Sequence, residues 1–538
     1  MKTTLLAFFY FFVFVLFTSC EDDDKKVHEY VPDNTFRTYY VHFDQKHQEI
    51  DNFGASDAWT FRHVGKNWPL EKRNAIADLL FSLEKDVDGK PKGIGLSLWR
   101  MVFGAGSLEK PYPGTQARWN NMPCIRDENG NYDMELDGEV GGQFWFVKAA
   151  KERGCEQFLG FCNSPPYYWT KTGYTNAIGE LSLQYELNLK DEHLTDFATY
   201  LAELVKRTKE KHGVTFNYVC PLNEPEWEAD GTESCHANND EVAYVAKAVN
   251  AKFVEYGLDT KVVIPESGKP HFVYSAPEGL PNHEKYGNKA EYFFSSKSSA
   301  NLLEQSNVAK LLATHSYWSV DTDSELRQIR EAVGQKIKET GIKYWQTEFC
   351  ILSNDYDLGT ADDGTPVGGG GRDCSMKLAL YVARIIHADL VFANASAWHW
   401  WLGATPFDYK DGLLYLTDDY NDGDITVPKL LWAFGNYSRF IRPGAIRLGM
   451  TRDNGDTNEL RDVMSSAYLN KDGKLVVVMI NYSDEEREIK LDFSDDKSRS
   501  MIPYITSDIE GDDLKPSNAV KEGDIYILPA KSIVTFSE

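Results

Sequence analysis

The chain has 538 residues, with 57 lysines and arginines against 82 aspartates and glutamates, which gives a formal net charge of −25 at pH 7. This acidity argues against a nucleic-acid partner, because phosphate binding requires a basic surface. The length predicts about two to four domains, or one large barrel with an appendage. Aromatic residues make up 13% of the chain, which excludes a disordered polypeptide and fits either a large apolar core or a ligand that stacks on rings.

The N-terminus has the pattern of an export signal. Lys2 precedes an apolar run of 13 residues, Leu5–Phe17. That run has the length of a signal-peptide core, ~7–15 residues, and is shorter than the ~20 residues that span a bilayer. Small residues then precede Cys20, which resembles a bacterial lipoprotein cleavage site, and a simple secretory signal is the alternative.

Four acidic residues follow Cys20, and they are similar to the surface-export signal of Bacteroidetes lipoproteins. We therefore expect a lipoprotein signal peptide over residues 1–20 and an acidic linker over 21–35. A lipid on Cys20 would hold the protein at the outer membrane or cell surface. A periplasmic or secreted protein is the alternative.

Eight short apolar runs alternate with helical patterns through most of the chain. Helices are predicted to begin at Asp191, at Asn238 or Asn239, and near Asp373. Several runs are almost continuously apolar, as strands buried on both faces are. The alternation predicts a (β/α)8 barrel over residues 51–437, with a doubly wound sheet as the alternative. The runs are Asn52–Trp59, Gly93–Phe103, Gln157–Cys162, Phe216–Leu222, Lys261–Ile264, Leu311–Tyr317, Lys343–Phe349 and Ala395–Leu402.

The last part of the chain has a different texture. Short strand-like runs are separated there by Asn, Asp, Gly and Lys turns, which predicts an antiparallel β-sandwich over residues 438–538. The strand-like Thr38–Asp44 lies within residues 36–50, which we expect to add an N-terminal strand to this domain. The runs are Leu475–Asn481, Glu488–Phe493, Met501–Thr506, Ile525–Leu528 and Ser532–Phe536.

No motif points to a metal ion or a cofactor. The glycine run 368–371 lacks the Lys-Ser/Thr of a phosphate-binding loop, and no Cys or His spacing is typical of zinc. Seven cysteines remain besides Cys20, an odd number that argues against a disulfide framework. A disulfide between Cys235 and Cys374, which both lie in loop-like stretches, stays open.

Two of the predicted strands end in a glutamate. Barrel enzymes place catalytic groups at the carboxyl ends of their strands, and the fourth and seventh runs end at Glu224 and Glu348. Two facing carboxyl groups suit cleavage of a glycosidic bond, since one can donate a proton while the other attacks the anomeric carbon. Glu266, just after the fifth run, is a competitor for the second role.

The chain resembles glycoside hydrolase family 30, in the branch similar to endo-β-1,6-galactanases. Asn-Glu-Pro at the end of the fourth strand looks like the acid/base motif of retaining enzymes built on (β/α)8 barrels. The resemblance runs from the end of the linker almost to the C-terminus. Its motifs are Gln48–Trp59, Leu98–Arg100, Asn163–Trp169, Asn223–Pro225, His315–Tyr317, Thr347–Glu348, Trp398–Trp401 and Phe440–Gly444.

The resemblance implies a role for each matching residue. Glu224 would be the general acid/base and Glu348 the nucleophile. Polar side chains around them would bind the sugar 2-OH (Asn223), hold Glu348 by hydrogen bonds (Arg100, Tyr317) and support the acid/base (His315). Aromatic and acidic residues would stack on the sugars (Trp169, Trp401) and line the innermost subsite (Asp57, Trp59). Trp400 is left open as the inward-facing indole in place of Trp401.

The expected function is that of a monomeric, cofactor-independent retaining β-glycoside hydrolase. Its substrate would be a β-linked oligo- or polysaccharide, with β-1,6-galactan leading. Family members that cleave glucosylceramide carry an acidic residue where this chain has Gly104–Ser107, so that specificity is not expected. The alternatives are an exo-acting enzyme of the β-D-fucosidase or β-glucosidase type, and a non-catalytic surface glycan-binding protein.

Overall fold

The computed structural model describes residues 37–113, 119–177, 187–226, 232–276, 283–352, 355–360, 366–453, 460–495 and 497–538. The predicted signal peptide and linker, residues 1–35, lie outside the described residues. Within the described part of the chain, no helix combines the length and the apolar character needed to cross a bilayer.

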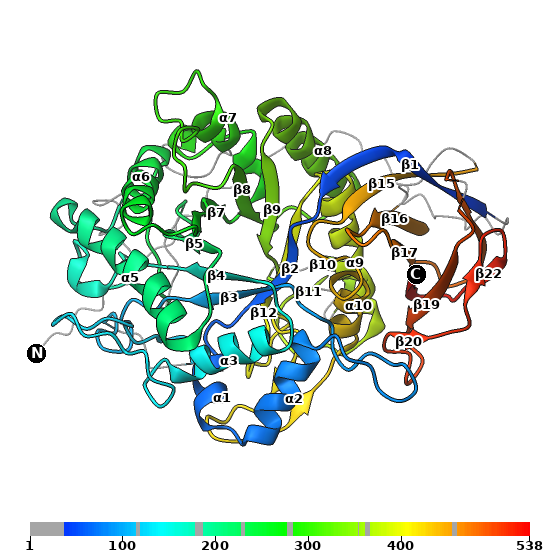
Figure 1. Cartoon of the computed structure of the whole chain (residues 1–538), viewed down its shortest axis with the longest axis horizontal. Helices are drawn as coiled ribbons and strands as arrows, with labels where there is room; N and C mark the ends of the chain where they lie inside the picture. The colour runs from blue at the N-terminus through cyan, green and yellow to red at the C-terminus, as the bar shows by residue number, and fades with distance from the viewer. Residues whose placement is uncertain are drawn as a thin grey trace, which may run out of the picture. The chain divides into compact units, whose positions relative to one another are not determined.

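One large parallel sheet contains a strand from each of the eight predicted runs (Figure 1). Its order is β6-β5-β4-β3-β2-β12-β9-β8-β7, and every pairing in it is parallel. The strands are β2 (Asn52–Ser56), β3 (Leu98–Val102), β4 (Gln157–Phe161), β5 (Tyr218–Cys220), β6 (Lys261–Val262), β7 (Pro265–Ser267), β8 (Leu311–His315), β9 (Lys343–Glu348) and β12 (Ala397–Leu402).

The two edges of this sheet meet on one stretch of chain. Only Val263 and Ile264 separate β6, at one edge, from β7, at the other. The Val263 N–H donates to Val219 O on the β5 side, and the Ala313 N–H of β8 donates to Ile264 O. The sheet is therefore curled, which is consistent with the predicted barrel.

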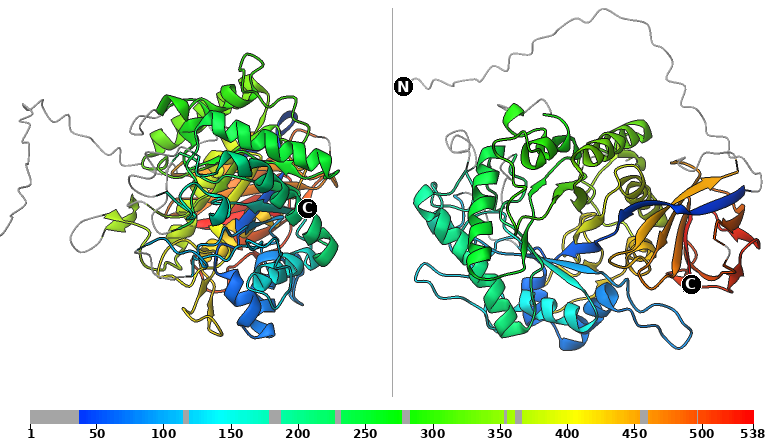
Figure 2. Two further views of the ribbon diagram at one scale, coloured as in Figure 1. Left: turned by 90° about the vertical axis from the view of Figure 1, so that its left-hand side faces the viewer. Right: turned by 45° about the horizontal axis from the view of Figure 1, so that its top comes forward.

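Helices follow most of these strands and cover the outer face of the sheet (Figures 1 and 2). Asn238 caps α6 through a capping box with Glu241. The cap of α9 is Ser375, whose Oγ accepts from Leu378 N, so the prediction of Asp373 was wrong by two residues. The helices are α1 (Phe61–Asn67), α2 (Leu70–Phe81), α3 (Gly141–Glu152), α5 (Leu194–His212), α6 (Asn239–Glu255), α7 (Lys289–Phe294), α8 (Asp323–Thr340), α9 (Met376–Val391) and α10 (Lys429–Ser438).

Side chains on the parallel strands alternate between the barrel interior and the helix layer. Along β12, Trp398 and Trp400 pack into the core that includes the helices, while Ala397 and Leu402 join the interior cluster. Trp401 packs partly against that interior cluster, and the Trp400 indole N–H donates to Asp411 O. Trp401 is therefore the indole that faces inward.

A second sheet holds β1 and the C-terminal strands, in the order β20-β19-β23-β17-β16-β15-β1-β18-β22. Tyr526 of β22 lies 5.0 Å from Phe536 of β23, between ring centroids, although these strands are far apart in the sheet order. The sheet thus folds over onto itself as a sandwich. The strands are β1 (Arg37–Glu49), β15 (Ile446–Arg452), β16 (Val463–Leu469), β17 (Leu475–Asn481), β18 (Arg487–Phe493), β19 (Ser500–Thr506), β20 (Lys515–Pro516), β21 (Val520–Lys521), β22 (Ile525–Leu528) and β23 (Ser532–Ser537).

The sandwich is mixed rather than purely antiparallel, because β1 pairs parallel with β18 and antiparallel with β15. Strand β17 is buried on both faces: Val477 packs inside the sandwich, while Val476 and Val478 pack toward the large core. The Thr535 hydroxyl of β23 also donates to Asn436 O of α10 at 2.7 Å. Four short strands lie outside both large sheets: β10 (Asp355–Thr360), β11 (Pro366–Val367), β13 (Tyr415–Leu416) and β14 (Ile425–Thr426).

Cys235 and Cys374 are not joined by a disulfide. Cys235 is buried, with its Sγ 3.9 Å from His236 O, whereas Cys374 is exposed. The disulfide that the sequence left open between Cys235 and Cys374 is therefore not formed in this structure.

A buried histidine in α9 makes the fold sensitive to acid. Neither ring nitrogen of His387 has a hydrogen-bond partner among the described residues, and burial, with Arg447 nearby, lowers its pKa to about 3. The unfolded chain binds a proton at this histidine near pH 6.5 and the native chain does not, so stability falls as the pH drops from about 6.5 toward 3.

We compare the free energy of unfolding of His387→Leu with that of the wild type. The difference between them should shift in favour of the variant by roughly 2–3 kcal/mol when the pH falls from 7.5 to 4.5. Urea unfolding of both proteins at the two pH values measures this. An unfolding difference that does not change with pH would contradict the argument.

Candidate active site

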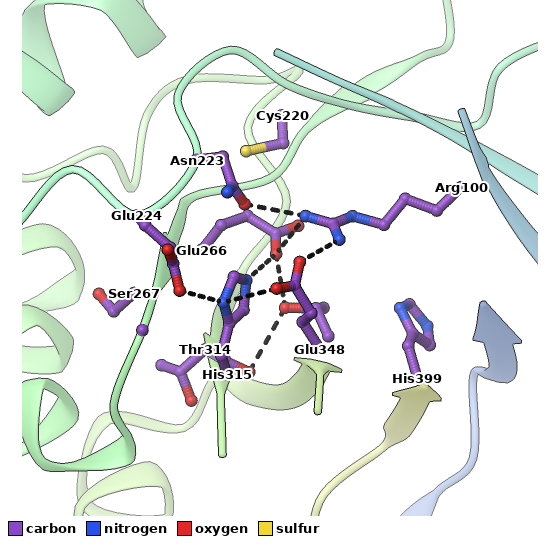
Figure 3. A network of polar contacts seen from close by, with 12 residues as sticks. Arg100, Cys220, Asn223, Glu224, Glu266, Ser267, Thr314, His315, Glu348 and His399 are labelled. Carbon is purple, nitrogen blue, oxygen red and sulfur yellow. Dashed lines mark hydrogen bonds and ion pairs between the residues drawn. The ribbon is translucent and has the colours of Figure 1, made fainter. Parts of the chain in front are cut away.

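Functional side chains converge at the carboxyl ends of the parallel strands. Arg100 lies on β3, Glu224 follows β5, His315 ends β8 and Glu348 ends β9. Figure 3 shows these side chains pointing toward one another from different strands. They adjoin a cavity of about 170 Å³. Its lining residues are Trp59, Asn163, Asn223, Glu224, Thr232, Glu233, Ser234, Tyr317, Trp318, Glu348, Leu352 and Trp401.

Glu348 is held from both of its carboxylate oxygens. Arg100 Nη1 donates to Oε2 at 2.6 Å, and the Tyr317 hydroxyl donates to Oε1 at 3.0 Å. Hydrogen bonds from charged and neutral donors stabilise the ionised form of a carboxyl group. Burial raises the pKa of Glu348, while His315 and Arg100 act in the opposite direction.

Glu224 faces Glu348 across the cavity. One carboxylate oxygen of each lies within 4.8 Å of the other and of a nitrogen of His315. The side chain of Glu224 is 21% exposed, against 6% for Glu348. His315 Nδ1 lies 2.8 Å from Glu224 Oε1 and 3.6 Å from Glu348 Oε1. The two carboxyl groups therefore differ in exposure.

A third carboxylate, Glu266, lies beneath the pair. It is fully buried and does not line the cavity. Its Oε2 accepts from Thr347 Oγ1 at 2.6 Å, and lies 3.1 Å from His315 Nε2 and 3.3 Å from Arg100 Nη2. Burial alone would raise its pKa, but Arg100, His315 and Thr347 hold it at about 2. Glu266 is thus a fixed negative charge that orients the two cations of the site.

His315 is an imidazolium in this setting. Burial alone would lower its pKa, but Glu348, Glu224 and Glu266 raise it to about 10. With both ring nitrogens protonated, His315 donates to Glu224 on one side and to Glu266 on the other. Two cations, Arg100 and His315, then face three carboxyl groups. One proton bound to the carboxyl groups makes this buried cluster neutral.

The backbone is strained at two of these glutamates. Glu224 and Glu266 have φ values of +44° and +58°, in the left-handed region that residues with a side chain rarely adopt. The Glu224 N–H donates to Glu266 O at 2.9 Å, which ties the two residues together. Such strain costs of order 1–3 kcal/mol per residue and is concentrated at functional sites.

Glu224, His315 and Glu348 form a grouping that could hold a metal ion by distance alone. The donor chemistry does not fit a metal. Arg100 and Tyr317 already donate to the two oxygens of Glu348, which places donors where a cation would need acceptors. The arrangement fits proton transfer between carboxyl groups.

The structure brings most of the predicted site residues together. Asn223 Oδ1 accepts from Arg100 Nη2 at 2.9 Å, and Asn223 lines the cavity. Trp59 and Trp401 both line it and form an edge-to-face pair, with ring centroids 5.5 Å apart. Tyr317 lines the same cavity.

Two predicted ligand contacts lie away from the cavity. Asp57 is fully buried, accepting from Val102 N at 2.8 Å and from Gln143 Nε2 at 2.9 Å. It holds the β2 and β3 ends together instead of lining a subsite. Trp169 is 7% exposed, with Arg126 5.2 Å above its ring and His193 stacked at 6.0 Å. Trp169 does not line the cavity, and its stacking on a sugar stays a prediction.

Glu233 and Trp318 line the cavity without a predicted role, and Glu226 is a buried glutamate outside that lining. Glu233 lines the wall and accepts from the backbone of the 104–107 stretch, which carries no acidic side chain of its own. Trp318 is 41% exposed at the cavity. Glu226 forms a buried ion pair with Lys289 at 2.9 Å, and also accepts from Ser267 Oγ. No spacing in the sequence singles these residues out.

Removing the charge of Glu266 should destabilise the fold. Glu266→Gln leaves Arg100 and His315 buried with one carboxylate fewer, and breaking a buried ion pair in this way costs about 3–5 kcal/mol. Urea unfolding at pH 7 measures the loss. Glu331→Gln, which removes one partner of an exposed pair with Arg327, is the matched control and should stay close to the wild type. Equal stability of the two variants would contradict the role given to Glu266.

Comparisons with known proteins agree with this geometry. A crystal structure of a conserved exported protein from Bacteroides fragilis is 31% identical, covers 93% of this chain and 100% of its own, and has a TM-score of 0.84. The catalytic domain of a family 30 xylanase C from Talaromyces cellulolyticus shares the fold, at 22% identity and a TM-score of 0.65, covering 93% of this chain and 99% of its own. The glucuronoxylanase XynC of Bacillus subtilis (strain 168) is 28% identical over 163 residues, 29% of this chain and 34% of that protein. The match thus spans about a third of this curated relative.

Two family models cover both domains. The model for O-glycosyl hydrolase family 30 matches residues 37–415, and the model for the glycosyl hydrolase family 30 beta sandwich domain matches residues 444–536. The first alone spans well over half of the chain. Together with the paired carboxyl groups at the strand ends, these matches show that the chain belongs to O-glycosyl hydrolase family 30, which confirms the family prediction from its motifs.

Proposed function

We propose that this protein is a retaining β-glycoside hydrolase, with Glu348 as the nucleophile and Glu224 as the general acid/base. The observation that carries the proposal is the separation of their carboxylate oxygens, within 4.8 Å. Retaining enzymes place the two carboxyl groups about 5–5.5 Å apart, whereas inverting enzymes need about 6.5–9.5 Å to admit a water.

The contacts of the two glutamates support this division of roles. Glu348 receives hydrogen bonds from Arg100 and Tyr317, which favour the ionised form that a nucleophile requires. Glu224 is the more exposed of the two, and its Oε1 faces the His315 imidazolium. This exposure lets the carboxyl group of Glu224 reach the leaving-group oxygen of a bound substrate, as a general acid must.

The reaction follows in two steps. Glu348 attacks the anomeric carbon and forms a glycosyl ester, while the bond to the leaving-group oxygen breaks and that oxygen takes the proton of Glu224. Glu224, now a carboxylate, removes a proton from water as the water attacks the same carbon. The ester bond breaks, Glu348 is released, and two inversions leave the product with the starting configuration.

The curled parallel sheet also supports a more specific description of the fold. We propose that it is a complete (β/α)8 barrel, closed through the chain segment that contains β6 and β7. Such closure explains how residues from β3, β5, β8 and β9 meet at one end of the sheet.

The proposed substrate is a β-linked glycan, with β-1,6-galactan first. The resemblance to the endo-β-1,6-galactanase branch supports galactan, while the xylanase relatives make β-1,4-xylan the main rival. The cavity of about 170 Å³ is smaller than the roughly 300–1,000 Å³ of sites that enclose a whole small ligand. It suits one reacting sugar unit of a longer chain, and an exo-acting β-D-fucosidase or β-glucosidase is the alternative reading of that size. A non-catalytic glycan-binding protein is the remaining rival.

Hydrolysis of a substrate panel tests the proposal. Wild-type protein should hydrolyse aryl β-glycosides and, among β-1,6-, β-1,4- and β-1,3-linked oligosaccharides, prefer the β-1,6-linked galactans. Proton NMR during the reaction should show the β-anomer as the first product. Glycan binding without hydrolysis of any β-glycoside, or the α-anomer as first product, would contradict the proposal.

Export is also proposed, from the N-terminal sequence and from the similarity to an exported protein of Bacteroides fragilis. Cys20 would carry the lipid and the mature protein would act as a monomer. Labelled palmitate should enter the wild type and not Cys20→Ala, and light scattering of the soluble part should give the monomer mass. Labelling of both proteins, or of neither, would contradict the lipid anchor.

A further inference from the structure

Glu233 is a carboxylate in the cavity wall that the proposed reaction does not use. It lines the cavity with Asn223, Glu224 and Glu348, yet the residue is 2% exposed. Burial raises its pKa to about 7, against the donors that surround it. Burying a carboxyl group costs free energy, so we expect this position to serve a function.

The donors around Glu233 occupy its two oxygens unequally. Oε1 accepts from Ala105 N at 3.1 Å, from Ser107 N at 3.1 Å and from Ser107 Oγ at 2.8 Å. Among the described residues, Oε2 accepts from Ala105 N alone, at 3.0 Å. Each carboxylate oxygen offers about two acceptor positions. Among the described residues, Oε1 is therefore filled and Oε2 keeps an unused position.

Charge offers no alternative partner. No lysine, arginine or histidine of the described chain forms an ion pair with Glu233, unlike Glu226, Glu266 and Glu348. In a cavity that receives a sugar, the available donors are hydroxyl groups. We propose that Glu233 Oε2 accepts a hydrogen bond from one hydroxyl of the sugar in the reacting position, and so selects for sugars that carry it. This inference rests on the proposed function.

The proposal has a chemical consequence for substrate choice. In its ionised form, which dominates above about pH 7, Glu233 is an acceptor without a donor. It then recognises a hydroxyl group and disfavours a negatively charged group at the same place. Glu233 would therefore favour a neutral sugar over the corresponding uronic acid. A hydrogen bond to a charged group of this kind corresponds to roughly 10- to 100-fold in kcat/KM.

Glu233 also joins two loops, and a test must separate that from contact with the sugar. The variant Glu233→Gln separates the two roles. The three donors at Oε1 hold the amide oxygen there, which places the NH₂ group where Oε2 lies in the wild type. An acceptor is thereby exchanged for a donor with little change in shape. Ser107→Ala is the control, since it loosens the joint between the loops and leaves the carboxylate in place.

The experiment compares kcat/KM for an aryl β-glycoside with its monodeoxy analogues, one for each hydroxyl of the sugar. The wild type should discriminate about 10- to 100-fold at one position that Glu233→Gln no longer distinguishes, to within about threefold, while its discrimination elsewhere is unchanged. Ser107→Ala should lower kcat/KM for all analogues alike and keep the wild-type ratios. Glu233→Asp, which withdraws the carboxylate, should lose discrimination at the same position and serves if Glu233→Gln does not fold.

Wild-type ratios in Glu233→Gln at every position, or an equal loss at all of them, would overturn the inference and leave Glu233 as a joint between loops. That outcome keeps the proposed function, because the wild type still hydrolyses the parent glycoside. Absence of hydrolysis by the wild type would instead refute the proposed function itself.

Discussion

Glu348→Gln is expected to lower kcat for aryl β-glycosides by about 10⁴-fold or more, the scale seen when one member of a catalytic unit is removed. The amide cannot form the glycosyl ester, while Arg100 and Tyr317 remain to hold it in place. KM should change little, because the cavity keeps its lining. Steady-state kinetics with a saturating aryl glycoside measure the loss.

Azide separates this prediction from general damage to the site. Glu348→Gly opens space for a small anion at the position of the lost carboxylate, so azide should restore turnover and give the α-glycosyl azide from a β-glycoside. Arg100→Lys is a useful companion, since it weakens the support of Glu348 and keeps the nucleophile. Restoration by azide in Arg100→Lys and not in Glu348→Gly would contradict the assignment of the nucleophile.

Glu224→Gln is expected to slow hydrolysis in a way that depends on the leaving group. General acid catalysis contributes about 10²- to 10⁴-fold, so glycosides with a poor leaving group should lose that much in kcat/KM. An aryl glycoside with a very acidic phenol needs no proton and should lose little in the first step. The glycosyl ester on Glu348 then accumulates, because no base activates the water of the second step.

The pH dependence gives a second view of Glu224. In the wild type the basic limb of the kcat/KM profile reports loss of the proton from the general acid, and the acidic limb reports protonation of the nucleophile. In Glu224→Gln the basic limb, which follows loss of the acid's proton, should disappear for the activated substrate. Azide should now yield the β-glycosyl azide. A leaving-group dependence equal to that of the wild type, or a retained basic limb, would contradict the acid/base role.

Sequence alone predicts the placement of the catalytic pair because the fold itself brings the ends of the strands together. Parallel strands meet at their carboxyl ends, so Glu224 and Glu348 need only end their strands to be neighbours in space. The apolar runs that mark those strands are buried on both faces and stand out from the helices. Strand β17 can be predicted from the sequence for the same reason, because both of its faces are buried and its residues are almost all apolar.

Strands whose buried residues are polar were missed. β15 buries Arg447, which donates to Gln48 Oε1 and Asn394 Oδ1, and β16 contains two buried serines, Ser465 and Ser466. The partners of Arg447 are remote in sequence, and the hydroxyl groups of Ser465 and Ser466 are buried without a hydrogen-bond partner among the described residues. A local pattern of hydrophobicity therefore gives no sign of their burial.

The supporting role of Glu266 was also hidden from sequence. Glu266 was seen only as a rival to Glu348, because its contacts with Arg100, His315 and Thr347 arise from three other strands. Its tertiary neighbours decide that role, and the residue type alone does not.

The most direct test of the double-displacement mechanism is to trap the ester. A 2-deoxy-2-fluoro aryl β-glycoside with an acidic phenol slows the second step, so the labelled protein can be digested and its peptides weighed by mass spectrometry. We predict one added sugar per chain, on the peptide that contains Glu348, at its side-chain carboxyl group. Attachment to Glu266 or Glu224, or hydrolysis of natural substrate without any trapped ester, would contradict the mechanism.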